Sequence, residues 1–369
     1  MRTYLDHNAT SPIRPSVIEA MTARMGLPLN ASSVHGEGRE GRKVIERARE
    51  EVAALVGADP KGVTFTSGGT EANNTVLSPI IQFGSEKREF TKLFVSAVEH
   101  PCVLAGGRFK KDAIQLLPVD GNGVVRLDNA RDALANIERP FVSCMFANNE
   151  TGVIQPIAEL GSIVHEREGF FHVDAVQAAG KVPIDIFELE VDAMTLSAHK
   201  LGGPQGVGAI ARRLIGTGIP ALMSGGGQEL GYRGGTENVV GIEGFGVAAR
   251  EALDAMGDGR LQSQLEEGLK SLSSEIVIFG EGVERLPNTT CFSLPDKRAE
   301  TALIAYDMAG FAVSSGSACS SGKVGPSHVL EAMGVAPDIG LGAVRVSTGW
   351  NTTSDDIERF LEKTKNLIG

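Results

Sequence analysis

The chain of 369 residues carries 46 acidic and 35 basic side chains, a net charge of −11 at pH 7, and 42% of its residues are hydrophobic. This length and composition predict a globular protein with a large buried core, commonly divided into two domains. The acidic balance argues against nucleic acid or an anionic membrane surface as the main partner.

Targeting and membrane-spanning patterns are not evident in the sequence. The first residues, MRTYLDHNAT, lack the apolar stretch of a signal peptide, and no apolar run approaches the roughly 18 residues of a membrane helix. The four cysteines, Cys102, Cys144, Cys291 and Cys319, do not have the spacing of a metal clip or a redox pair. We therefore expect a cytoplasmic protein with reduced cysteines and no resident metal.

Short apolar runs typical of strands alternate with helical patterns along the first two thirds of the chain. This alternation predicts an α/β fold, with a mostly parallel sheet and helices on both of its faces. The predicted strands cover residues 62–66, 92–100, 114–119, 141–150, 170–177, 192–199 and 206–213, and the predicted helices cover 70–81, 157–168 and 238–256.

The alternation continues in shorter units toward the end of the chain. We expect a large domain over residues 15–245 and a smaller α/β domain over residues 246–369, with which residues 1–14 could be associated. The strands predicted here cover 291–295, 311–319 and 343–349, and the helices cover 299–310, 327–334 and 354–369.

Small and polar residues follow the first predicted strand in the sequence TFTSGGTEANN. Gly68 and Gly69 permit a tight turn, and Thr70 begins a helix whose free N–H groups could hold an anion. The same residues also fit an ordinary capped turn between a strand and a helix. The stretch lacks the lysine of a P-loop and the full G-x-G-x-x-G spacing, so it does not indicate a nucleotide site.

Two charged residues end later strands. Asp174 ends the strand in HVDAVQAAG, where a buried carboxylate needs a cationic or N–H partner unless it only caps a helix. Lys200 follows Ser197 and His199 in TLSAHKLGG, where a lysine either extends its amine to solvent or presents it to a pocket. An amine that forms an imine at neutral pH needs a pKa lowered by burial or by neighbouring positive charge.

An anion-binding turn, a strand-end carboxylate and a lysine are what pyridoxal 5′-phosphate (PLP) requires for its phosphate, ring nitrogen and aldehyde. Family motifs extend over essentially the whole chain: YLDHNATSP (4–12), NASSVHGEGR (30–39), FTSGGTEANN (65–74), VEHPCV (98–103), ANNETGV (147–153), HVDAVQAAGK (172–181), AHKLGGPQGVGA (198–209), GGGQELGYRGGTEN (225–238), SSGSACSSG (314–322) and RVSTG (345–349). With these motifs the chain resembles the cysteine desulfurases, of the bacterial housekeeping and nitrogen-fixation type. They belong to the class V aminotransferase group of fold-type I PLP enzymes.

The resemblance implies a role for each matching residue. Lys200 would bind the PLP aldehyde covalently and later shuttle a proton, Asp174 would pair with the ring nitrogen, and His100 would stack on the ring and assist proton transfer. Gln177 would bind the ring hydroxyl, Asn149 would lie beside the ring and the substrate, and Arg345 would bind the substrate carboxylate. The PLP phosphate would be bound by Gly69, Thr70, Ser197 and His199, and Thr236 would bind the phosphate in a neighbouring subunit. The role of Thr236 implies a homodimer.

Cys319 lies among small, flexible and polar residues in SSGSACSSGKVG, a setting that favours a reactive thiol over a structural one. The resemblance implies that its thiolate removes the sulfur of bound L-cysteine, so that alanine leaves and Cys319 carries a persulfide. An acceptor protein, such as an iron–sulfur scaffold, would then take the sulfur. A transient iron–sulfur contact at Cys319 is the only metal contact expected.

Several alternatives stay open at this level. Taken singly, His100 fits a loop position, Arg345 a surface charge and Asn149 a turn. Another class V PLP enzyme, such as a selenocysteine lyase or an aminotransferase, and a non-catalytic partner protein share the same scaffold. A metal hydrolase that uses His172, Asp174 and His199 would lack the usual ligand spacing.

Overall fold

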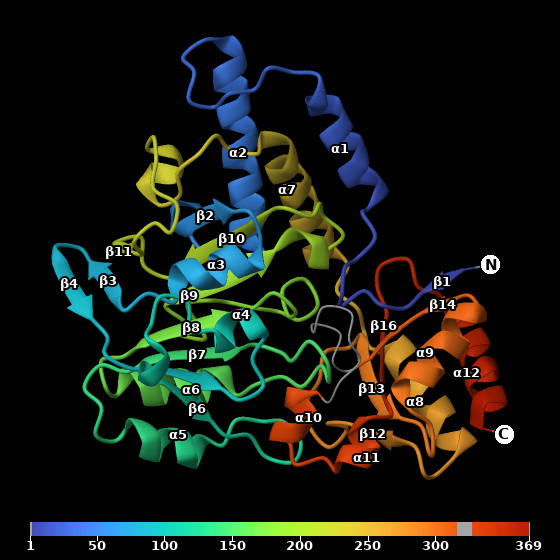
Figure 1. Ribbon diagram of the computed structural model, residues 1–369. Helices are drawn as coiled ribbons and strands as arrows, with labels where there is room; N and C mark the ends of the chain where they lie inside the picture. The colour runs from blue at the N-terminus through green and yellow to red at the C-terminus, as the bar shows by residue number, and fades with distance from the viewer. Residues whose placement is uncertain (1, 316–326, 369) are drawn as a thin grey trace.

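A seven-stranded sheet forms the centre of the computed structural model, which describes residues 2–315 and 327–368 (Figure 1). From β9 to β6, every neighbouring pair of strands is parallel, whereas β10 runs antiparallel to its two neighbours, β2 and β9. This confirms the predicted mostly parallel sheet. In spatial order the strands are β2 (Val63–Thr66), β10 (Gly208–Arg212), β9 (Ala193–Ser197), β8 (Phe170–Asp174), β7 (Phe141–Met145), β5 (Leu93–Ser96) and β6 (Ile114–Leu117).

Alternate residues along these strands pack into two separate apolar clusters, one on each face of the sheet. On β5, for example, Leu93 and Val95 belong to one cluster and Phe94 to the other. Helix α3 (Gly69–Val76) contributes to the first cluster. The second cluster includes residues of α2 (Gly36–Ala54), α5 (Leu127–Leu134), α6 (Ile157–His165) and α7 (Val239–Asp254), and α1 (Pro15–Met25) lies against α7. Helices therefore cover both faces.

A second, antiparallel sheet lies beside the central one, on the side where Figure 1 marks both chain ends. The start of the chain joins this region, because β1 pairs with β14 and Leu5 lies in the same apolar cluster as the strands and helices there. The elements are β1 (Thr3–Tyr4), β12 (Val277–Ile278), β13 (Thr289–Ser293), β14 (Phe311–Ala312), β15 (Ser314–Ser315), β16 (Ala343–Ser347), α8 (Arg260–Leu272), α9 (Ala299–Met308), α10 (His328–Ala332), α11 (Pro337–Gly340) and α12 (Ser354–Ile368). The predicted boundary between residues 245 and 246 stays a prediction.

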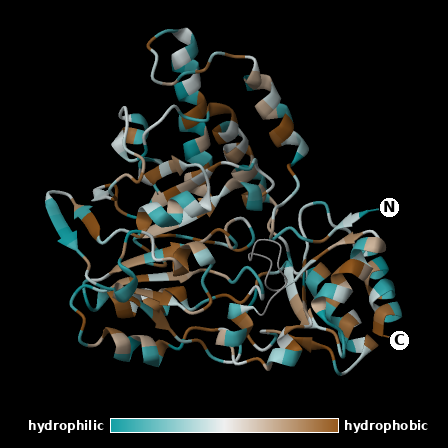
Figure 2. Ribbon diagram, in the orientation of Figure 1, coloured by the Kyte–Doolittle hydropathy of each residue, from teal (hydrophilic) through white to brown (hydrophobic). Residues whose placement is uncertain are grey.

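One predicted helix is wrong in its second half. Helix α3 ends at Val76, and Ile80–Phe83 forms β3, which pairs with β4 (Glu86–Glu89) and β11 (Thr217–Gly218). Pro79 explains the break, because proline supplies no backbone N–H and disfavours a helical conformation in the residue before it. Figure 2 shows hydrophilic residues on β4, whereas the central strands carry hydrophobic ones.

The parallel arrangement brings most of the predicted site residues to one edge of the sheet. Strands β2, β5, β7, β8 and β9 run in the same direction, so the segments that follow them leave the sheet at the same edge. Ligands in open α/β sheets bind at this edge, beyond the carboxyl ends of the strands.

A buried ion pair fastens the segment after β11 to the central sheet. Glu229, whose side chain is 4% exposed, accepts hydrogen bonds from both terminal nitrogens of Arg49 at 2.8 Å and from the backbone N–H of Phe65 at 2.8 Å. Glu46 contacts the same guanidinium at 3.3 Å but is 57% exposed. The two carboxylates therefore differ in burial while sharing one partner.

We predict that Glu229→Gln lowers the free energy of unfolding by about 3 kcal/mol, because it leaves the buried Arg49 charge without its compensating carboxylate. Glu46→Gln should change it by less than about 0.5 kcal/mol, as expected for an exposed pair. Urea denaturation of the two variants makes the comparison. Equal stabilities would show that the buried pair does not fasten this segment.

Glu99, in the turn after β5, is fully buried. Its Oε1 accepts hydrogen bonds from Ser96 Oγ and from the backbone N–H of Met145, both at 2.6 Å, and its Oε2 has no partner within the described residues. Burial raises the pKa of Glu99 to about 8 despite these two hydrogen bonds. The folded chain thus keeps a proton that the unfolded chain releases above pH 4.5, its ordinary value.

Because the folded state binds the extra proton, Glu99 costs the protein stability progressively as pH rises from about 4.5 to about 8. We predict that Glu99→Gln, which cannot ionise, gains a few kcal/mol relative to wild type between about pH 5 and about pH 8. Urea denaturation at both pH values tests this. The exposed Glu159→Gln should follow wild type, and the same behaviour in Glu99→Gln would contradict the assignment.

Candidate active site

Segments from both sheets and from the start of the chain meet around a cavity of about 310 Å³, called here the strand-edge cavity. Ten of the twelve predicted site residues line it: Gly69, Thr70, His100, Asn149, Asp174, Gln177, Ser197, His199, Lys200 and Arg345. Thr236 is exposed and does not line it. Cys319 lies outside the described residues.

One wall of the cavity is the start of α3. Gly68 has a φ of 155°, and a Cβ on Gly208 would lie 2.5 Å from the carbonyl carbon of Gly68, so the close approach of β10 to this turn requires glycine. The first N–H groups of α3, at Gly69 and Thr70, face no preceding helical turn. Such unpaired N–H groups form a favourable binding site for an anion.

Asp174 ends β8 and is 6% exposed. Its Oδ2 accepts a hydrogen bond from Asn73 Nδ2 at 2.7 Å, and its Oδ1 accepts one from the backbone N–H of Val176 at 3.0 Å. Burial raises the pKa of Asp174, and no residue in the described ranges forms an ion pair with it. Each oxygen thus accepts one hydrogen bond from an uncharged group. The negative charge of the carboxylate is therefore available to a cationic ligand.

Lys200 ends a short 3₁₀ turn, Ala198–Lys200, that follows β9. Its Nζ donates hydrogen bonds to the carbonyl oxygens of Asn8, at 2.5 Å, and Ala9, at 2.9 Å. The next residues turn sharply at Gly202, where φ is 84°. The amine therefore lies against the main chain of the N-terminal segment inside the protein, which argues against a lysine that merely extends to solvent.

His199 and His100 are both neutral at pH 7. Burial, with the charge of Lys200, lowers the pKa of His199 to about 4, and its Nδ1 lies 3.1 Å from Thr10 Oγ1. Burial is also the main cause of the lowered pKa of His100. His100 is the N-cap residue of α4 (Pro101–Leu104), where its side chain accepts a hydrogen bond from the backbone N–H of Cys102.

Cys102 is a cavity residue that the sequence analysis missed. Its Sγ lies 2.9 Å from His100 Nδ1 and 3.3 Å from Asn73 Nδ2. Burial raises its pKa to about 12, and burial likewise raises the pKa of Cys144 and of Cys291. None of these three thiols is ionised at neutral pH.

Arg345, on β16, is 1% exposed, so it is not a surface charge. Its Nη2 pairs with Asp6 Oδ1 at 2.6 Å, and its Nη1 donates to the carbonyl oxygen of Asn149 at 2.8 Å. The turn chemistry expected of Asn149 belongs instead to Asn148, whose Oδ1 accepts from the backbone N–H of Glu150. Arg345 and Asn149 thus form one side of the cavity together.

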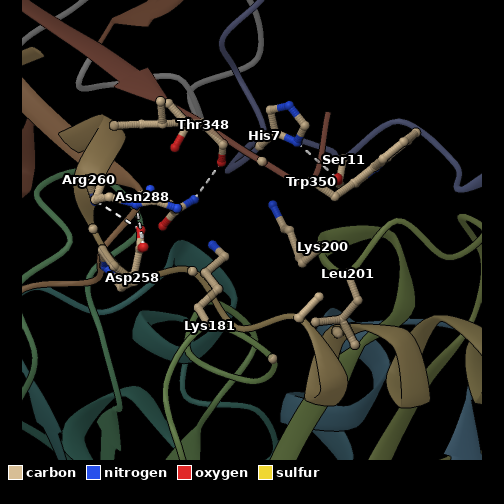
Figure 3. A pocket seen from close by; sticks show the side chains of 18 of the residues that line it. His7, Ser11, Lys181, Lys200, Leu201, Asp258, Arg260, Asn288, Thr348 and Trp350 are labelled. Carbon is tan, nitrogen blue, oxygen red and sulfur yellow. Dashed lines mark hydrogen bonds and ion pairs between the residues drawn. The ribbon is translucent and has the colours of Figure 1, made fainter. Parts of the chain in front are cut away.

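Lys200 also lines a second cavity, of about 170 Å³, into which Lys181 points as well (Figure 3). Lys181 Nζ donates to Asn8 Oδ1 at 2.9 Å and to Gln177 Oε1 at 3.0 Å. Burial, with the charges of Lys200 and Arg345, lowers the pKa of Lys181 well below its ordinary value. Asn8 therefore joins the two lysines, one through its carbonyl and one through its side chain.

The sequence analysis missed this role of Lys181 and Asn8. The available signal was spacing, because residues at i and i+4, such as Gln177 and Lys181, meet on one side of a helical turn. With Oε1 taken by Lys181, Gln177 directs Nε2 to the carbonyl oxygen of Asn8 at 3.0 Å. Its amide orientation is therefore fixed from both sides.

The metal-hydrolase alternative finds no support. His172 is fully buried between Ser143 and Thr195 and does not line the strand-edge cavity. Within residues 2–315 and 327–368, no three His, Cys, Asp or Glu side chains are grouped as a metal site. The same part of the chain has no helix that combines the length and the apolar character of a membrane span.

Comparisons with known proteins agree with this geometry. A cysteine desulfurase from Cereibacter sphaeroides is 40% identical over 380 residues, which cover 100% of this chain and 96% of the relative. The solved NifS-like protein from Rickettsia africae superposes with a TM-score of 0.89 at 36% identity, over 100% of this chain and 99% of that one. A structure of SspA in complex with cysteine superposes with a TM-score of 0.78 at 28% identity, over 94% of this chain and 98% of that one.

The family model of the class-V aminotransferases matches residues 3–360, nearly the whole chain. The family model and these relatives extend over the segments that carry the strand-edge cavity and both sheets. The chain belongs to the aminotransferase class-V family.

Proposed function

We propose that this chain is a PLP-dependent cysteine desulfurase, which converts L-cysteine to L-alanine and leaves the sulfur as a persulfide on Cys319. One observation carries the proposal. The strand-edge cavity places the amine of Lys200, the carboxylate of Asp174 and the first N–H groups of α3 around a single space. These are the three groups that hold an aldehyde, a ring nitrogen and a phosphate.

The residues present fit PLP. Asp174 is a buried carboxylate that lacks an ion-pair partner in the described chain, which suits a cationic ring nitrogen. Lys200 would hold the aldehyde, Gln177 the ring hydroxyl, and His100 the ring face. The phosphate would contact Gly69, Thr70, Ser197 and His199, all of which line the cavity. When bound, the cofactor supplies an electron sink that weakens the bonds to the α-carbon of an amino acid.

Proton handling falls to Lys200 and His100. Lys200 Nζ, held beside the carbonyl oxygens of Asn8 and Ala9, is positioned to take a proton from the substrate and return it to the product. Burial keeps His100 neutral, and its Nδ1 faces Cys102. Because Nδ1 accepts a hydrogen bond from the backbone N–H of Cys102, the other ring nitrogen, Nε2, would be the atom that exchanges a proton.

Arg345 and Asn149 orient the substrate. A guanidinium binds a carboxylate through two parallel N–H groups, and Asp6 holds Arg345 in place for this contact. The solved complex of SspA with cysteine, on the same fold, supports an amino acid of this size as the ligand.

Cys319 supplies the nucleophile. The Cys319 thiolate attacks the sulfur of L-cysteine, a sulfur–sulfur bond forms, the carbon–sulfur bond breaks, and the electron pair remains on the carbon, which is protonated to give alanine. The raised pKa values of Cys102, Cys144 and Cys291 support this assignment, since protonated thiols are weak nucleophiles. An acceptor protein, such as an iron–sulfur scaffold in transient contact with Cys319, then takes the sulfur.

The active form is a cytoplasmic homodimer in this proposal. Thr236 is exposed and lies outside the strand-edge cavity of its own chain, so it could contact a bound phosphate only across an interface with a second copy. The main competing function is another class V PLP reaction, such as selenocysteine lysis or transamination, which would not require Cys319.

Turnover of L-cysteine, followed as alanine and sulfide, separates these functions. In Cys319→Ala, the rates of alanine and sulfide formation should fall at least about a hundredfold, whereas L-cysteine should still change the visible absorbance of the PLP-bound protein. Lys200→Ala should lose the products and the absorbance change, whereas the exposed Lys110→Ala should retain both. Undiminished alanine production by Cys319→Ala would overturn the proposed mechanism.

A further inference from the structure

A line of buried polar side chains leads from Asp174 into the protein, away from the strand-edge cavity. Asn73 Nδ2 contacts Asp174 Oδ2 at 2.7 Å, and Asn73 Oδ1 contacts Thr195 Oγ1 at 2.6 Å. Beyond it, Thr195 Oγ1 lies 3.3 Å from His172 Nε2, and His172 Nδ1 lies 2.8 Å from Ser143 Oγ. Asn73 and the three residues behind it are at most 1% exposed.

The sheet register creates this line. Ser143 on β7 is opposite His172 on β8, and Asp174 at the end of β8 is opposite Thr195 on β9. Because these positions differ by two residues along β8, their side chains lie on the same face of the sheet. Helix α3, which covers that face, adds Asn73.

The hydrogen bonds have a single direction when Asp174 is ionised. Since a carboxylate only accepts, Asn73 donates through Nδ2 and turns Oδ1 toward Thr195. Thr195 donates its single hydroxyl hydrogen to that oxygen, so its own oxygen can only accept a hydrogen bond from His172 Nε2. Burial lowers the pKa of His172 to about 3, so the ring is neutral and its Nδ1 accepts from Ser143. Every donor points toward Asp174.

We propose that Thr195 and His172 are positioning residues that act through Asn73 to hold Asp174 as an ionised carboxylate toward the ring nitrogen of PLP. This inference rests on the proposed function. A hydrogen bond donated to a carboxylate favours its charged form and opposes the effect of burial. Thr195 also prevents the Asn73 amide from turning its oxygen toward Asp174, and neighbouring bonds in such a chain strengthen one another.

A purely structural role predicts something different. Four polar groups inside an apolar core are costly to bury, and apolar groups of the same shape fill such space equally well. If packing were their only task, removal of the Thr195 hydroxyl would change stability slightly and leave PLP binding unaffected. The effect on PLP affinity therefore separates positioning from packing.

The test measures the dissociation constant of PLP for Thr195→Val, which keeps the shape of the side chain but removes its hydroxyl. We expect affinity about tenfold weaker than in wild type, and recovery to within about threefold in Thr195→Ser. Thr75→Val makes the same chemical change on α3, where the Thr75 hydroxyl contacts only the Glu71 carbonyl oxygen among the described residues, and should not alter affinity. If circular dichroism shows that Thr195→Val folds poorly, Thr195→Ala takes its place, and the same loss of PLP affinity is expected.

A double-mutant cycle decides whether the effect passes through Asp174. In an Asp174→Asn background, Thr195→Val should weaken PLP binding by less than about twofold, because the carboxylate it supports is gone. An equal loss of PLP affinity in the wild-type and Asp174→Asn backgrounds would overturn the inference, as would no loss in the wild-type background. Neither result would affect the proposed function. Failure of the wild-type protein to bind PLP would overturn both.

Discussion

The proposed site depends on keeping one carboxylate, that of Asp174, charged inside the protein. Asp174 is buried at the end of β8 and has two hydrogen-bond donors but no ion-pair partner within the described residues. A charge in that position is costly unless the surroundings and a ligand compensate it. In our proposal, the sheet register and the placement of α3 supply this compensation from the protein, and the ring nitrogen of the cofactor supplies it from the cavity.

Parallel strands explain why the site is assembled from distant parts of the chain. The segments after β2, β5, β7, β8 and β9 emerge at one edge, and β16 of the second sheet brings Arg345 to the same cavity. The N-terminal segment closes the arrangement, since Asn8 contacts Lys200, Lys181 and Gln177. In the proposed mechanism this arrangement couples the two sheets, because the second sheet would hold the substrate's carboxylate and the central sheet would hold the cofactor.

Strand patterns and strand-end polar residues are local signals, and they predicted the parallel sheet, the turn at residues 68–70, Asp174 and Lys200. The remaining cavity residues, such as Gln177 and Arg345, followed only from the resemblance to a family. The prediction missed that the helix before Pro79 ends at Val76, and it missed Asn73 and Cys102 in the strand-edge cavity, Lys181 in the neighbouring cavity and Thr195 behind Asn73. Their functions depend on neighbours far apart in sequence, such as the contact of Asn73 with Asp174 at a separation of 101 residues. Hydrophobic periodicity carries no information on such pairings.

The central claim is that Lys200, and not the neighbouring buried Lys181, captures the cofactor's aldehyde opposite Asp174. Both amines point into the cavity shown in Figure 3, but only Lys200 also lines the strand-edge cavity. Borohydride reduction of the PLP-loaded protein, followed by peptide mass spectrometry, identifies the attached residue. We expect the phosphopyridoxyl group on Lys200 alone; its presence on Lys181, or the absence of any labelled lysine, would contradict this account.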